Sequence, residues 1–288
     1  MRLKIKISEQ LNENINKKTE MIKVEIHSIF QNSINFLYGD RMYVLQPMGF
    51  YKTPLSCILE LDLENFNLLK KQINHRFILS YEKFYIGEFI FDTLILNKNL
   101  KINKINEIEN LRIFYNFLEK KLLTQKFSGV LFNAFIYLKN KNRKLTALEK
   151  YFLEKLELIF SKNFKIQDFE YFLGAGEGLT PSGDDFICGY LASLFFLGKF
   201  EVIKQIKNIL EPQLHKTTRV SEEYLYYALM GRFNEYVFNL NELCNKKRLG
   251  NLLTEIDKEI VNIKKIGHSS GTDFLIGLYC GLVREGKW

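Results

Sequence analysis

The sequence lacks the paired cysteines of a metal or redox site. Its four cysteines stand at positions 57, 188, 244 and 280, and no two of them have a C-x-x-C spacing. Cys188 and Cys280 lie inside apolar runs, which is typical of buried thiols that pack as small hydrophobes. We therefore expect a reducing compartment, with neither a zinc site nor a dithiol.

The sequence also lacks an apolar run long enough to cross a bilayer. The longest apolar stretches are 186–198 and 274–283, and both have lengths that suit buried helices. Residues 1–10 alternate basic and apolar side chains and contain no apolar core of a signal peptide. We expect a cytoplasmic protein without a membrane partner.

Basic residues are not concentrated in one region, although the formal net charge is +8. Lysines are spread along the chain among many Asn and Ile residues, and the run KNKNRK at 139–144 is typical of a solvated loop. This pattern favours a compositional bias over a nucleic-acid surface, so we expect no nucleic-acid partner. A net positive field would suit small anionic substrates.

The two parts of the sequence have different periodicities. Residues 21–61 and 76–96 contain short runs of β-branched and aromatic residues broken by turn signals, with a short helix expected at 62–73. Residues 108–123 have helical apolar spacing, and Thr146 with Glu149 forms a capping box at the start of the next helix. From residue 183 onward the pattern predicts helices almost throughout.

These periodicities predict an α+β fold with two domains. A β-rich N-terminal domain is expected at 1–105 and a helical domain at 106–288, which carries the candidate anion-binding site. No Pro/Gly-rich linker separates them, so we expect the β-rich part to be packed on the helical part.

An internal repeat lies in the helical part. Residues 182–189 (SGDDFICG) and 270–277 (SGTDFLIG) share Ser, Gly, Asp, Phe and Gly at five of eight positions, 88 residues apart. Each copy predicts a helix start with Ser as a cap and Asp in the capping-box position. Gly189 and Gly277 cost helix propensity, which close helix–helix contact would explain. We infer that the two helices cross there and bring their N-termini together.

The first candidate binding segment is the glycine-rich loop 174–185. Its glycines expose backbone N–H groups directly before a helix N-terminus, a combination that binds phosphate or carboxylate. It is neither a Walker A loop nor a dinucleotide fingerprint, because the Lys-Ser/Thr and the third spaced glycine are missing. The residues assigned to anion binding here are Gly176, Gly178, Thr180, Ser182, Gly183 and Asp185.

Two further segments could complete the site. In 216–221, hydroxyls from Thr217 and Thr218 accompany Arg219, a possible bidentate clamp for a carboxylate or phosphate, just before a helix that Ser221 is expected to cap. In 267–273, His268 stands among small polar residues at a helix start, which favours a neutral imidazole able to donate or accept a proton. Ser269, Ser270 and Asp273 are the residues assigned to substrate or phosphate binding in this segment.

Asp184 and Asp185 form an adjacent acidic pair. We expect Asp185 to cap its own helix and Asp184 to be free for the substrate, a cation or Arg219. Two carboxylates could hold Mg²⁺ through waters, but the spacing supplies no third carboxylate ligand. The sequence therefore favours no metal and no cofactor, with His268, Asp184 and Arg219 as candidate catalytic residues.

The three segments together resemble the AllH family. The resemblance rests on GEGLTPSGDDFICGYL at 176–191, TTRVS at 217–221 and IGHSSGTDFLIGL at 266–278. It covers the C-terminal half, and Glu177 stands where the family usually has proline.

The resemblance implies a subunit of oxamate carbamoyltransferase, which interconverts oxalurate plus phosphate with oxamate plus carbamoyl phosphate in allantoin and purine catabolism. It also implies FdrA-like and AllG-like partner subunits. In that setting, N–H groups of 176–183 would hold phosphate, Arg219 the oxamate carboxylate, and His268 or Asp184 would move the proton.

Two other functions are compatible with the sequence. The chain could be a non-catalytic anion-sensing or assembly subunit of such a complex. A nucleotide-dependent kinase or ligase is a third reading, although no Walker or kinase motif supports it. If the three segments make one site, Ser182, Arg219 and His268 should line a single concave pocket.

Overall fold

The computed structural model describes residues 3–16, 22–73, 77–80, 82–95, 100–125, 127–141, 143–247 and 250–286. These residues form two compact units, Met1–Leu100 and Lys101–Trp288. The first unit is rich in strands and the second is mostly helical, so the α+β class is confirmed. Of the strand region predicted at 76–96, both end residues, Arg76 and Leu96, lie outside the described part, as does Tyr81.

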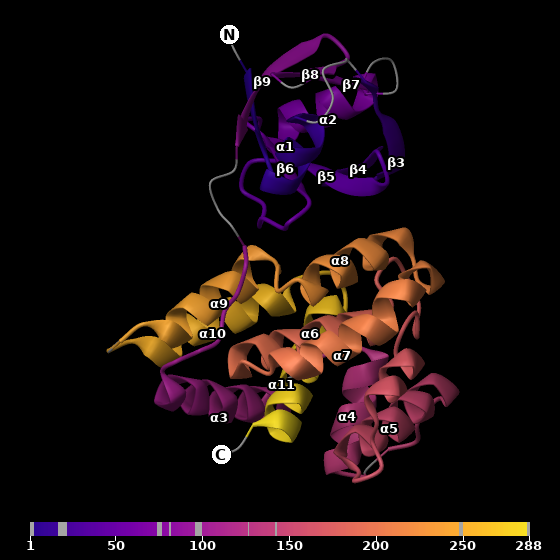
Figure 1. Ribbon diagram of the computed structural model, residues 1–288, viewed down its shortest axis with the longest axis vertical. Helices are drawn as coiled ribbons and strands as arrows, with labels where there is room; N and C mark the ends of the chain where they lie inside the picture. The colour runs from indigo at the N-terminus through magenta and orange to yellow at the C-terminus, as the bar shows by residue number, and fades with distance from the viewer. Residues whose placement is uncertain are drawn as a thin grey trace. The chain divides into compact units, whose positions relative to one another are not determined.

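The N-terminal unit is a nine-stranded sheet with two helices. The sheet order is β2-β7-β8-β9-β1-β6-β5-β4-β3 among the described residues (Figure 1). The strands are β1 (Leu3–Ile7), β2 (Ile22–Lys23), β3 (Glu25–Ile29), β4 (Ile34–Tyr38), β5 (Arg41–Pro47), β6 (Ser56–Leu59), β7 (Phe77–Leu79), β8 (Lys83–Ile86) and β9 (Phe89–Ile95); the helices are α1 (Glu9–Asn16) and α2 (Leu63–Gln72).

The sheet closes nearly into a barrel. Its two end strands, β2 and β3, are separated only by Val24, whose N–H donates to the Phe77 carbonyl oxygen at 2.9 Å. One extended segment therefore supplies both edges, which leaves few unpaired edge groups. The core of this unit also includes apolar residues of α1 and α2, among them Leu11 and Phe66.

The middle of this sheet is a strand that the sequence analysis did not assign. β1 pairs in parallel with β9 and antiparallel with β6. The basic–apolar alternation at the N-terminus buries Ile5 and Ile7 completely. That alternation is the period-2 pattern of a half-buried strand.

The C-terminal unit is helical. Its elements are α3 (Ile108–Thr124), α4 (Val130–Lys139), α5 (Ala147–Phe160), η1 (Ile166–Tyr171), α6 (Ser182–Leu197), α7 (Phe200–Leu210), η2 (Glu211–Lys216), α8 (Arg219–Leu229), α9 (Glu235–Asn245), α10 (Leu252–Lys264) and α11 (Ser270–Glu285). The helix predicted at 108–123 is confirmed as α3. The capping box of Thr146 and Glu149 is confirmed at the start of α5. None of the described helices is long and apolar enough to span a membrane.

The two motif-bearing helices, α6 and α11, pack in parallel in the interior of this unit. A Cβ at Gly189 would lie 1.9 Å from the Phe274 carbonyl oxygen, and a Cβ at Gly277 would lie 2.0 Å from the Phe186 carbonyl oxygen. Only glycine permits this approach, so the predicted crossing at the two glycines is confirmed. Because equivalent positions meet reciprocally, the pair has local pseudo-two-fold symmetry.

Candidate functional site

The glycine-rich loop begins the site. Gly174, Gly176 and Gly178 all have positive φ, at 70°, 121° and 93°. A Cβ at Gly176 would meet the Ser182 nitrogen at 2.7 Å, so the loop folds back against the first residue of α6. Gly174 lies against the Lys216 carbonyl at the end of η2 in the same way. The loop therefore passes closely between the starts of α6 and α8.

Asp184 joins this loop to the segment before α8. One carboxylate oxygen accepts the Gly174 N–H at 2.7 Å, and the other accepts the Thr217 hydroxyl. Burial raises the pKa of Asp184, while its bonds with Gly174, Thr217 and the Ser221 hydroxyl act to lower the pKa. Asp184 is only 1% exposed to solvent, so it is a buried residue that links two loops by hydrogen bonds.

Two threonines complete the links between the three predicted segments. The Thr218 hydroxyl donates to the Leu179 carbonyl oxygen, which ties the α8 start to the glycine loop. The hydroxyls of Thr180 and Ser270 hydrogen-bond at 2.8 Å, which ties the loop to the start of α11. Segments 217–221 and 267–273 are therefore each joined to the glycine loop 174–185 by side-chain hydrogen bonds.

The aspartates of the two repeat copies face the serines of the opposite copy. Asp185 lies beside the Ser270 hydroxyl, and Asp273 lies beside the Ser182 hydroxyl. The predicted caps are wrong, because α6 and α11 begin at Ser182 and Ser270 without a side-chain cap bond. The Ser-Gly-x-Asp pattern is used between the helices instead of within each helix.

The neighbouring carboxylates Asp184 and Asp185 also have the reverse of their expected roles. Asp184, predicted to be free, has both oxygens bonded. Asp185, predicted to cap its helix, has one buried oxygen without a hydrogen-bond partner among the described residues. Likewise, Ser221 is not the cap of α8, because Thr218 holds that position and accepts from the Ser221 N–H at 3.1 Å.

The electrostatics at this end of α6 and α11 favour negative charge. Two parallel helices place the positive ends of their dipoles side by side, which is unfavourable without an anion nearby. Asp184, Asp185 and Asp273 lie in the first turns of these helices. Burial raises the pKa of Asp273 to about 7, and burial together with Asp273 raises the pKa of Asp185 well above its usual range.

Arg219 is held by two carboxylates of its own helix. Its guanidinium lies 2.8 Å from Glu222 and 2.9 Å from Glu223. Glu223 is completely buried, whereas the Glu222 side chain is 25% exposed. The buried pair fixes the direction of Arg219, and the outer pair is a partly solvated contact of the kind that contributes little stability.

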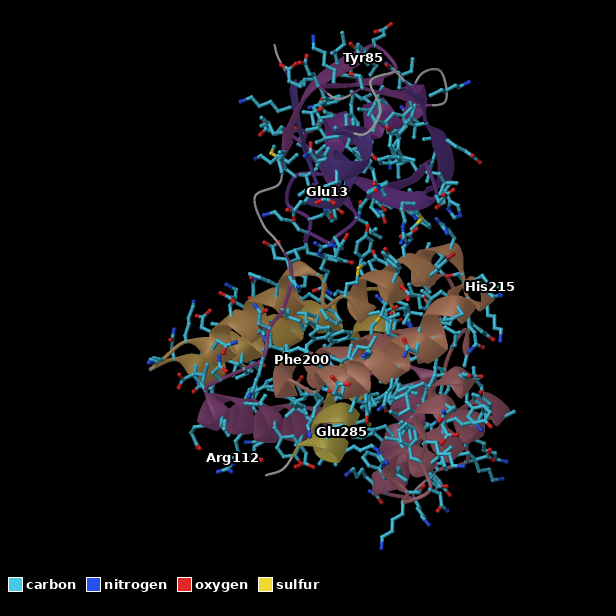
Figure 2. All side chains as sticks on the ribbon, viewed as in Figure 1. Glu13, Tyr85, Arg112, Phe200, His215 and Glu285 are labelled. Carbon is cyan, nitrogen blue, oxygen red and sulfur yellow. The ribbon has the colours of Figure 1, made fainter. Side chains whose placement is uncertain are left out.

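The remaining predicted residues differ in burial. His268 and Gly178 are exposed, and Ser269 is partly exposed. Gly183 is buried against the Phe172 carbonyl, where a Cβ would come within 2.0 Å of the oxygen. His215, exposed at the end of η2 and labelled in Figure 2, precedes the Thr217 segment.

A fourth segment, which precedes α4, lies at the site and was not predicted from the sequence. Gly129 has a φ of 125°, and a Cβ there would lie 2.9 Å from Ser269 Cβ and 3.5 Å from an Asp273 oxygen. The start of α4 therefore lies beside the start of α11. The available signal was Ser128-Gly129 before an apolar run, the same dipeptide that begins both repeat copies.

No group of three or more His, Cys, Asp or Glu side chains suited to a metal ion occurs within the described ranges. The three segments bring together helix N-termini, hydroxyl groups and carboxyl groups. Such groups can bind a small anion through N–H and O–H donors and can exchange a proton with it.

A comparison with protein families matches this same region. Residues 172–282 match the model of the family described as oxamate carbamoyltransferase subunit AllH. This region is therefore similar to the AllH family. The AllH match begins just before the glycine loop and ends within the last turn of α11, so it contains all three predicted segments. No solved structure matches the chain.

Proposed function

We propose that the chain is a subunit of a carbamoyltransferase that resembles oxamate carbamoyltransferase. The reaction would convert oxalurate, or a related ureido compound, and phosphate into oxamate and carbamoyl phosphate, as a step of allantoin and purine catabolism in the cytoplasm. The proposal rests on one observation. Hydrogen bonds link the glycine loop before α6 to the start of α8 and to the start of α11, and all three segments lie in the AllH match. FdrA-like and AllG-like subunits would be its partners.

The substrates suit this arrangement because all of them are small anions. Backbone N–H groups of 176–183 and the hydroxyls of Thr180 and Ser270 would hold phosphate near the positive ends of α6 and α11. A bound anion would also offset the unfavourable alignment of the two helix dipoles. No metal or cofactor enters the proposed mechanism.

Arg219 would bind the carboxylate of oxalurate or oxamate. A substrate carboxylate could replace Glu222, whose pairing with Arg219 is partly solvated, while buried Glu223 kept the guanidinium in place. His268 is exposed in the turn before α11 and would accept the proton that phosphate loses on attack. Asp184 would act by holding the loops in register rather than by touching the substrate.

Reconstitution with the two partner subunits tests this function. The complex should cleave oxalurate only when phosphate is present, and Arg219→Ala, His268→Ala and Asp184→Ala should each abolish the cleavage. Arg112→Ala is a matched control, because this exposed arginine of α3 pairs with Glu109 in the same helix and is not among the residues of the three segments (Figure 2). Near-normal turnover in all three site variants would contradict the proposal.

One observation favours a second function, that of an anion-sensing or assembly subunit. Asp184 and Arg219 already form bonds within the chain, as structural groups do. In that case phosphate would bind the isolated chain, yet turnover of the complex would be insensitive to Arg219→Ala and His268→Ala. Calorimetric titration with phosphate beside the turnover assay separates the two functions.

A further inference from the structure

The equivalent aspartates of the repeat, Asp185 and Asp273, are brought together by the symmetry of the helix pair. Each stands at the fourth position of its helix, three residues after the repeat serine. The reciprocal glycine contacts fix the crossing one turn further along both helices. Each carboxyl therefore lies beside the serine that begins the opposite helix.

Both side chains have buried oxygens that make no hydrogen bond within the described residues, although serine hydroxyls lie beside both carboxyls. Asp273 is fully buried, and neither of its carboxyl oxygens makes a hydrogen bond among the described residues. The same holds for one buried oxygen of Asp185. A buried carboxyl without hydrogen bonds is unfavourable when ionised, so such groups keep a proton or receive a ligand.

The two aspartates differ in their access to solvent. Asp185 is partly exposed, whereas Asp273 has no exposed surface. Thr180 and Ser270, which flank Asp185, are also partly exposed. A small molecule at the helix N-termini could therefore touch Asp185, and Asp273 would lie behind it.

We propose that Asp185 and Asp273 hold one proton between them and that Asp185 delivers this proton to the nitrogen that leaves the carbamoyl group. The delivery step rests on the proposed function. Asp185 is then a catalytic acid, and Asp273 is a positioning residue that keeps the proton on the pair at neutral pH. The ligand class is a neutral ureido group, because a half-protonated pair offers it one donor and one acceptor.

The electrostatic surroundings support a retained proton. Burial raises the pKa of both carboxyls, and Asp273 and then Asp184 raise that of Asp185 further. The hydroxyls of Ser270 and Thr180 on Asp185, and of Ser182 and Ser269 on Asp273, act in the opposite direction. A further ionisable group near Asp185 is Cys188, whose own pKa is raised well above the usual value by burial.

The proton count of the reaction balances through these groups. An oxygen of hydrogen phosphate attacks the carbamoyl carbon, a C–O bond forms, and the C–N bond to the oxamate nitrogen breaks. Asp185 gives its proton to that nitrogen, and His268 accepts the proton of hydrogen phosphate. Proton exchange with solvent then restores both groups, so neither an oxidant nor a metal is required.

Carbon-13 NMR of the full chain labelled at the aspartate carboxyl carbons tests the shared proton without any activity assay. Two resonances should titrate in two separate steps, with one proton retained on the pair at neutral pH. Asp185→Asn should lower the titration midpoint of Asp273 by more than about one pH unit, and Asp273→Asn should do the same for Asp185.

If either Asn variant does not fold, the titration of the wild-type protein alone still tests the shared proton. Two carboxyls that both ionise in the ordinary acidic range would overturn the shared proton. The same conclusion would follow if folded Asn variants left the partner's midpoint unchanged.

The delivery step is tested in the reconstituted complex with oxalurate and phosphate. Asp185→Asn should lower turnover by about 10²- to 10⁴-fold, the usual contribution of a general acid. Asp273→Asn should retain measurable turnover but move the alkaline limb of the pH profile to lower pH. An Asp185→Asn complex with a tenth or more of wild-type turnover overturns the delivery step and leaves the proposed function intact. A wild-type complex that does not cleave oxalurate overturns both.

Discussion

Asp184 shows at the residue scale how one side chain can join separate loops. A carboxylate has two oxygens, and here one accepts a backbone N–H from the glycine loop while the other accepts the Thr217 hydroxyl. Burial makes these bonds important, because a buried acceptor that loses its donor keeps its desolvation cost. The loops around the site therefore depend on Asp184 more than on any contact with solvent-exposed His268.

Thr217→Val removes the hydroxyl donor from Asp184 with little change in shape. The free energy of unfolding should fall by about 1–3 kcal/mol, since a buried carboxylate loses a partner. Thr254→Val, at an exposed position of α10, is the matched control and should change stability by less than about 0.5 kcal/mol. Urea denaturation of the three proteins measures the difference, and equal losses in both variants would contradict the role given to Asp184.

Asp273 gives stability a definite pH dependence. Its folded-state pKa is about 7, whereas the unfolded chain releases this proton near pH 4. Between these values the folded state binds more protons, so the free energy of unfolding falls as pH rises through this window. The fall has an upper bound of about 4 kcal/mol, and Asp185 acts in the same direction.

Urea denaturation between pH 4.5 and 7.5 checks this sign. Asp273→Asn should remove much of the decrease with rising pH, whereas Glu154→Gln, at an exposed position of α5, should leave it unchanged. If Asp273→Asn shows the same decrease as the wild type, Asp273 does not carry the proton.

At the scale of elements, the parallel pair of α6 and α11 positions the site. Their crossing places backbone against backbone, and Gly281 of α11 lies against the Ser193 hydroxyl further along. The hydroxyl of Tyr190, in the middle of α6, donates to Glu285 at the end of α11 at 3.1 Å (Figure 2 labels Glu285). Small residues at the crossing and this polar link hold the two N-termini in one place.

Gly189→Ala tests this crossing. The added methyl would meet the Phe274 carbonyl oxygen at 1.9 Å, and this backbone atom cannot turn aside as a side chain can. We expect a loss of about 2 kcal/mol or more despite the better helix propensity of alanine. Gly250→Ala, where nothing lies within 4 Å, should be nearly neutral. Thermal unfolding of both variants measures this difference. Equal unfolding midpoints for the two variants would show that the helices can separate at Gly189.

The repeat allowed the helix crossing to be predicted, but it did not reveal how serine and aspartate are used. Glycine at the eighth position of both copies has one plain cause, close helix contact, so Gly189 and Gly277 were informative. Ser-Gly-x-Asp fits a cap within one helix and a contact between two helices equally well. Only the fold distinguishes them, and the same ambiguity reversed the expected placements of Asp184 and Asp185.

Other features could not be predicted because their signals are local and weak. Gly129 approaches Asp273 through the placement of α4, which no spacing in the sequence encodes. The Arg219–Glu223 pair follows from helical spacing, but the complete burial of Glu223 does not. The strands after residue 21 were predictable from turn signals. The basic–apolar alternation at the N-terminus was not recognised as the strand β1.

At the scale of the whole molecule, the chain has two separate hydrophobic cores, one in each unit. The segment after Leu100 belongs to the helical unit: Ile102 N–H donates to the Gly231 carbonyl and Ile105 N–H to the Phe196 carbonyl, at 2.8 and 2.9 Å. Both isoleucine side chains are almost fully buried. The helical unit therefore carries its own core together with the complete candidate site.

Two fragments test where the helical unit begins. Residues 101–288 should fold alone into a helical protein with cooperative unfolding. Residues 106–288 should be less stable by several kcal/mol, because the loss of two buried isoleucines costs about 2–5 kcal/mol each. Circular dichroism during urea titration compares the fragments. Equal midpoints would show that residues 101–105 contribute nothing to the helical unit.

The central claim is that the three segments within the AllH match form a single site for a small anion. Amide hydrogen exchange of the reconstituted complex, with and without oxamate plus phosphate, measures this directly. We predict that ligand slows exchange together in 174–185, 217–221 and 267–273, with little change in 3–95. Protection restricted to the partner subunits, or found in only one of the three segments, would contradict it.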